Sequence, residues 1–138
     1  MMQTMMNKKM FKHYNSQYDF NTTVDTLKNA FNSSSIWVIL EEKDNAETYK
    51  DNGDIGNYIE LHLCHPPSAF KILSDDKTQF MAAMIPLQMC IYENSQKEVK
   101  ISVMNVKMMS KMFKDRDIKQ NVKDAASEMF SILNRIEK

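Results

Sequence analysis

The residues best suited to chemistry gather in one short stretch, where His62, Cys64 and His65 precede two prolines. A cysteine thiolate beside an imidazole can act as a nucleophile. Adjacent residues of a strand, however, point to opposite faces of a sheet, so Cys64 and His65 cannot form such a pair by themselves. A site in this stretch therefore needs a partner from another element.

The second cysteine, Cys90, could supply that partner if it lay on a strand beside Cys64 or His62. Two or three such soft ligands can bind a transition metal. A structural zinc site, however, uses four ligands in recognisable pairs, and the sequence contains no C-x-x-C or H-x-x-x-H. We therefore predict no metal site. We expect both cysteines to be buried core thiols that are insensitive to mild oxidation.

His65 is the most promising single residue, because it stands between a predicted strand and Pro66-Pro67, where its ring can be presented at the strand end. Histidine in such a place can serve as a ligand or as a base. An enzyme would also need a carboxylate, and the candidates Glu60 and Glu93 lie on separate predicted strands with unknown neighbours. We expect no catalysis, and an enzyme that uses His65 with a carboxylate is the alternative.

Composition argues against several classes of function. The 138-residue chain has 18 basic and 18 acidic residues, without the basic excess that binds nucleic-acid phosphates. Its two glycines, Gly53 and Gly56, are too few for a phosphate-binding loop. No apolar run is long enough for a signal peptide or a membrane span, which favours a cytoplasmic protein, although an exported chain without its signal would look the same.

The hydrophobic pattern predicts a single α+β domain over residues 10–138, after a frayed N-terminal segment of residues 1–9. Its helices should pack on one mainly antiparallel sheet. Residues 36–41 are predicted as a central strand, because their continuous apolar run is typical of burial on both faces. The other predicted strands are 10–18, 58–64, 81–92 with a break at Pro86, and 99–103. The predicted helices are 24–31 with an N-cap at Asn21, Thr22 or Thr23, then 46–49, 67–73, 105–113 and 118–136.

Three runs of residues resemble a known family. They are L-C-H-P-P-S-A-F-K-I-L from Leu63 to Leu73, M-I-P-L-Q-M-C-I-Y-E from Met84 to Glu93, and S-V-M-N-V-K-M-M-S-K-M-F from Ser102 to Phe113. With Ser35-Ile36-Trp37 before them, they are similar to motifs of the domain of unknown function 302. The resemblance implies a compact α+β fold that is commonly dimeric and has no agreed activity.

The chain departs from the motifs of that family at four positions. Leu87 replaces a cysteine, Gln88 an arginine, His65 the asparagine of a C-N-P motif, and Lys107 a glycine. Any role that depends on the cysteine and arginine is therefore not expected in this chain.

We predict a dimeric, non-catalytic binding module for a small apolar or planar ligand. Haem is the first candidate, because His65 could coordinate its iron and methionines suit its apolar face. The homodimer prediction rests on Met108, Met109 and Met112, whose surface is too apolar for one short helix to bury. A structural or interaction protein without a ligand is the remaining alternative. The predicted ligand-binding residues are His65, Cys64, Pro66, Pro86, Leu87, Met108 and Met112.

Overall fold

Five antiparallel strands form one sheet in the computed structural model, which describes residues 10–138; the predicted frayed segment 1–9 lies outside these residues. The sheet order is β1-β5-β4-β3-β2. The strands are β1 (Phe11–Asn15), β2 (Val38–Lys43), β3 (Tyr58–Cys64), β4 (Leu87–Glu93) and β5 (Val99–Met104). The predicted α+β class and the predicted β-hairpin, formed by β4 and β5, are confirmed.

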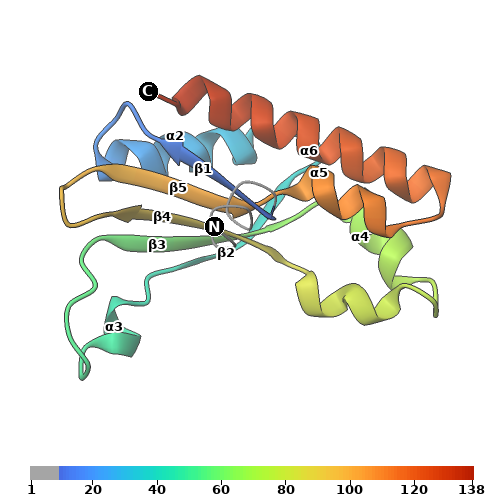
Figure 1. Ribbon diagram of the computed structural model, residues 1–138, viewed down its shortest axis with the longest axis horizontal. Helices are drawn as coiled ribbons and strands as arrows, with labels where there is room; N and C mark the ends of the chain where they lie inside the picture. The colour runs from blue at the N-terminus through green and yellow to red at the C-terminus, as the bar shows by residue number, and fades with distance from the viewer. Residues whose placement is uncertain (1–9) are drawn as a thin grey trace, which may run out of the picture.

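Two long helices lie along the same face of this sheet (Figure 1). They are α2 (Phe20–Asn32) and α6 (Arg116–Ile136). The short elements are α3 (Ala46–Tyr49), α4 (Pro66–Leu73), α5 (Val106–Met109) and the 3₁₀ helices η1 (Gln79–Met84) and η2 (Ser110–Met112). In Figure 1, α4 and α5 lie at one end of the strands, on the right, and α3 hangs from the other end.

The core forms where apolar side chains of the sheet meet the two long helices. Leu61, Met89 and Ile101 of the sheet are fully buried, as are Leu27 of α2 and Leu133 of α6. The apolar stripe predicted for the last helix is confirmed, because its members at positions 118, 122, 125, 126, 129, 133 and 136 are all buried. The opposite face of the sheet carries no long helix among the described residues.

The prediction that residues 36–41 form a central strand is wrong. β2 is an edge strand, and its Val38 and Leu40 are exposed. The apolar run is divided between the core and the edge strand. Trp37 precedes the strand and is buried in the core, and its Nε1 donates a hydrogen bond to the Ala125 carbonyl at 3.2 Å. A bulge between Ile39 and Glu41 interrupts the pairing with β3, a feature common on edge strands.

Three predicted boundaries also differ from the structure. The N-cap of α2 is Asp19, whose side chain accepts a hydrogen bond from the Thr22 backbone N–H, rather than one of residues 21–23. The first strand ends at Asn15 instead of residue 18. Residues 79–84 form η1 and not the first half of a strand, so β4 begins only after Pro86, which lacks the N–H that a sheet needs.

We expect Leu133→Ala to lower the free energy of unfolding by about 2–5 kcal/mol, because it leaves a cavity where α6 meets the sheet. Leu40→Ala is the matched control: this side chain is 57% exposed on the edge strand, and its loss should change stability by no more than about 0.5 kcal/mol. Urea unfolding of both variants measures the difference, and equal losses would contradict the described core.

Candidate functional site

A small apolar pocket lies where α4, α5 and α6 meet the carboxyl end of β3. Its volume is about 60 Å³. His65 and Ser68 contribute polar side chains to a lining that is otherwise mostly apolar, with Trp37, Met84 and Phe113 among the large members. The pocket therefore joins segments that are far apart in the sequence around one histidine.

His65 is held in place because it caps α4. Its backbone is extended, and Pro66 and Pro67 follow as the first helical residues, where a missing N–H costs nothing. The Ser68 backbone N–H donates a hydrogen bond to the imidazole Nδ1 at 3.3 Å, and the Ser68 hydroxyl lies 2.9 Å from the same nitrogen. Asparagine, the motif residue at this position, is a favoured N-cap, and His65 performs the same task through Nδ1.

This cap determines which nitrogen of the neutral ring carries the proton. Because Nδ1 accepts from a backbone N–H, the proton of a neutral His65 resides on Nε2. Burial lowers the pKa of His65, although the nearby negative charges of Glu128 and Asp124 act in the opposite direction. The ring is 8% exposed and is therefore neutral at pH 7, with Nε2–H as a hydrogen-bond donor.

Nε2 of His65 is buried and has no hydrogen-bond partner among residues 10–138. The ring packs edge-on against the Trp37 indole, with centroids 5.3 Å apart. A buried donor without a partner costs roughly 1–3 kcal/mol relative to a satisfied one. The structure thus places one unused polar atom on a ring that lines an apolar pocket.

The structure brings together three of the seven predicted ligand-binding residues. His65, Cys64 and Leu87 line this pocket, whereas Pro66, Pro86, Met108 and Met112 do not. Met109 lines it in place of the other two methionines of that segment. Trp37, Val122 and Phe113 also line the pocket and are not among the residues predicted from the sequence. The apolar stripe of the last helix contains Val122, but nothing in the sequence pairs it with His65.

The two cysteines are half-buried, and the expectation that both are buried core thiols is wrong. Burial still raises the pKa of the Cys64 thiol. Within residues 10–138, no three His, Cys, Asp or Glu side chains are grouped so as to hold a metal ion. Cys90 lies opposite Glu60 on the neighbouring strand, not opposite His62.

The pocket beside His65 does not favour haem. Its volume is about 60 Å³, whereas pockets for ligands of drug size have about 300–1,000 Å³. Coordination of iron through Nε2 would also move the imidazole proton to Nδ1, where it would face the N–H of Ser68. Haem at His65 remains a prediction, and it would require both the pocket and the cap to change.

The carboxylates considered for an enzyme do not reach His65. Glu93 accepts a hydrogen bond from the Asn57 side chain, and Glu60 is hydrogen-bonded to His62. Within the described part of the chain, His65 forms no ion pair with a carboxylate. The geometry therefore provides a small, mostly apolar pocket rather than a histidine–carboxylate dyad at this position.

Comparison with protein families matches the model of the domain of unknown function DUF302 to residues 12–136. The chain belongs to this family. A crystal structure of an uncharacterized conserved DUF302 protein from Bacillus stearothermophilus is similar in fold, with a TM-score of 0.74 and 17% sequence identity over 92% of this chain and 98% of that one. No match was found among curated proteins.

The DUF302 fold of this chain contains, within residues 10–138, no helix that is both long and apolar enough to cross a membrane. Although α6 has 21 residues, one side of it is charged and exposed.

We expect the DUF302 domain to lose stability as the pH falls below about 6.5, the ordinary pKa of histidine. Because folding lowers the pKa of His65, the unfolded chain binds a proton at a pH where the folded chain does not. The stability that neutral His65 contributes to the fold is therefore complete above the pKa of histidine in the unfolded chain. It is lost progressively as the pH falls from that value to the lower pKa of His65 in the folded chain.

The control variant is His65→Asn, which keeps a capping side chain but cannot titrate. Urea unfolding at pH 7.5 and 5.5 should give a larger loss of stability for the wild type than for the variant. An equal loss in both proteins would show that His65 is not the titrating group.

Proposed function

We propose that this DUF302 protein is a non-catalytic binding module for a small, neutral, mostly apolar molecule that carries one hydrogen-bond acceptor. The observation that supports this proposal is the buried, unpartnered Nε2–H of His65 in an apolar pocket. A carbonyl, ether or hydroxyl oxygen of a ligand would satisfy that donor. The negative charges of Glu128 and Asp124 near the ring disfavour an anionic ligand.

The volume of the pocket limits the size of the ligand. A cavity of 150 Å³ is known to hold benzene, so a space of about 60 Å³ accepts only a few heavy atoms without rearrangement. Met84 and Met109 are half-buried at the pocket wall. Methionine side chains change rotamer easily, so these two residues could enlarge the space for a somewhat larger molecule.

Trp37 provides a direct reporter for binding, because it is the only tryptophan of the chain and its ring contacts His65. Tetrahydrofuran and cyclopentane form a matched pair of probes that differ by one ether oxygen. We expect tetrahydrofuran to change Trp37 fluorescence saturably and at lower concentration than cyclopentane. His65→Asn should abolish the difference between the two probes, because it removes the Nε2 donor.

The proposal fails if neither probe produces a saturable change, or if His65→Asn responds to both as the wild type does. Titration with hemin tests the planar alternative in the same samples. A saturable Soret shift that His65→Asn abolishes would support haem and overturn the proposal of a small oxygen-bearing ligand.

We also propose that the protein is a homodimer. The residues that support the interface differ in part from the methionines predicted from the sequence. Met108 and Met109 are half-buried, whereas Met112 is exposed. Phe70 of α4 and Phe80 of η1 are each 74% exposed, and these two elements pack against each other. Two exposed aromatic rings on elements that pack together support association through this surface.

The dimer is tested by light scattering at tens of micromolar protein. We expect the mass of two chains for the wild type and of one chain for Phe80→Asp, since a charge at the interface opposes association. Lys97→Asp, at the tip of the β4–β5 turn, is the matched surface control and should remain dimeric. A single-chain mass for the wild type would overturn the proposal.

A further inference from the structure

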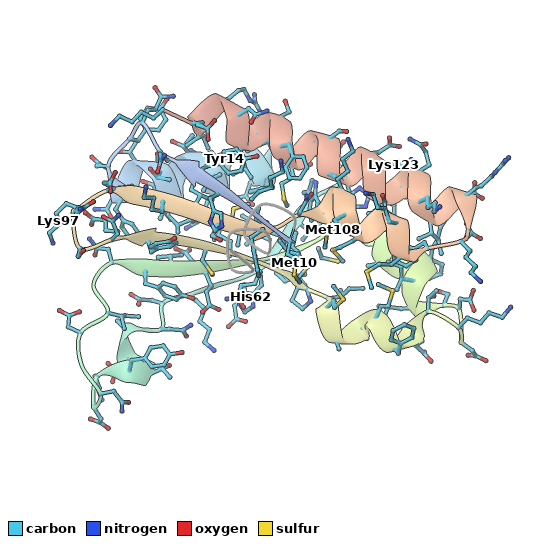
Figure 2. All side chains as sticks on the ribbon, viewed as in Figure 1. Met10, Tyr14, His62, Lys97, Met108 and Lys123 are labelled. Carbon is cyan, nitrogen blue, oxygen red and sulfur yellow. The ribbon has the colours of Figure 1, made fainter. Side chains whose placement is uncertain are left out.

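The face of the sheet that α2 and α6 leave uncovered carries a second group of chemically capable side chains. Figure 2 shows His62 on the side of the sheet away from Tyr14 and α6. Cross-strand pairing places Glu60 of β3 opposite Cys90 of β4, and Cys90 opposite Ser102 of β5. None of these four residues lines the His65 pocket.

Glu60 is the buried centre of this group. It is 6% exposed and accepts hydrogen bonds from the Tyr58 hydroxyl at 2.8 Å, from the Asn45 side-chain amide, and from His62 Nε2 at 3.0 Å. Burial raises the pKa of Glu60, but hydrogen bonds from His62 and Tyr58 and the charge of Lys43 outweigh it and lower the pKa overall. The group is therefore a carboxylate with three donors around it.

Tyr58 connects this carboxylate to the thiol of Cys90. Its hydroxyl oxygen lies 3.5 Å from Sγ of Cys90, and the Gln88 side-chain amide donates to the same sulfur at 3.4 Å. Burial and the interactions with Cys90 and Glu60 raise the pKa of Tyr58, so the phenol keeps its proton at neutral pH. Asn45 and His62 also donate hydrogen bonds to Glu60, so the carboxylate stays paired without Tyr58. The Tyr58 hydroxyl can therefore rotate and donate its hydrogen bond to a thiolate at Cys90 instead.

One donor, the Gln88 amide, already points at the Cys90 sulfur, and the Tyr58 hydroxyl, which donates to Glu60, can turn to that sulfur when Cys90 loses its proton. The thiolate is the nucleophilic state of cysteine. Cys64 differs, because no hydrogen bond to its sulfur is found within residues 10–138 and burial raises its pKa.

Cys90 also lies on the wall of a second pocket, with a volume of about 330 Å³. Phe11, Met84, Pro86 and Met104 make most of its lining apolar, and Ser102 and Gln88 add polar groups near the sulfur. This volume falls within the usual range for small-molecule pockets. The thiol is consequently accessible to an apolar molecule of modest size.

We propose that Cys90 is a modification site that reacts with small apolar carbon electrophiles, namely conjugated carbonyl compounds. The S–H bond breaks and the thiol proton leaves to solvent, while a bond forms between Sγ and the β-carbon of the electrophile. The electron pair of the carbon–carbon double bond moves to the α-carbon, which takes up a proton from water. The net reaction is addition of S–H across the double bond, and no oxidant or reductant is consumed.

The test uses N-phenylmaleimide, a conjugated imide with an apolar ring, at neutral pH, with peptide mapping by mass spectrometry. We expect Cys90 of the folded protein to be labelled at least about tenfold faster than Cys64. Tyr58→Phe should slow the labelling of Cys90 by about tenfold, because it removes one of the two donors to the thiolate. In urea-unfolded protein both cysteines should react at similar rates, which is the control for intrinsic reactivity.

Gln88→Leu provides an independent test, since this side chain is exposed and its replacement leaves the core intact. It should also slow labelling of Cys90, and it decides the outcome if Tyr58→Phe does not fold. The proposal is overturned if Cys64 reacts as fast as Cys90 in the folded protein. It is equally overturned if the folded variants label Cys90 at the wild-type rate.

Discussion

The structure depends on a sheet that buries only one of its faces. Alternating side chains of β3, β4 and β5 direct Leu61, Met89 and Ile101 toward α2 and α6, and this contact excludes water from most of the apolar surface of the domain. The other residues of the same strands face the uncovered side. Both the His65 pocket and the Cys90 pocket lie where polar side chains meet a mostly apolar lining.

The two histidines of the third strand segment illustrate two solutions to the burial of a polar group. His62 and its partner Glu60 satisfy each other, with further donors from Tyr58 and Asn45. His65 is satisfied only at Nδ1, through the cap of α4, and its Nε2 is not paired within the described chain. A fully hydrogen-bonded network stabilises one arrangement of its side chains. A buried donor without a partner can instead form its hydrogen bond with an acceptor on a ligand.

The same division explains why the two cysteines differ although neither is fully buried. Cys90 lies in the middle of the uncovered face, where cross-strand neighbours bring Tyr58 and Gln88 to its sulfur. Cys64 ends its strand beside the helices and gains only burial. Their surroundings, rather than their residue type, therefore decide which sulfur has polar side chains within hydrogen-bond distance.

The sequence by itself determined the α+β class, the β4–β5 hairpin and the buried stripe of α6, because these depend on hydrophobic periodicity within short segments. The three family motifs in the sequence, likewise, were enough to indicate DUF302. Periodicity could not show that the apolar run near Trp37 is divided between the core and an edge strand. Only the tertiary structure decided that, since burial of a strand depends on which strands pair on each side of it. It alone also brought Trp37 to His65 and Tyr58 to Cys90, because contacts between distant segments arise from packing that no local pattern encodes.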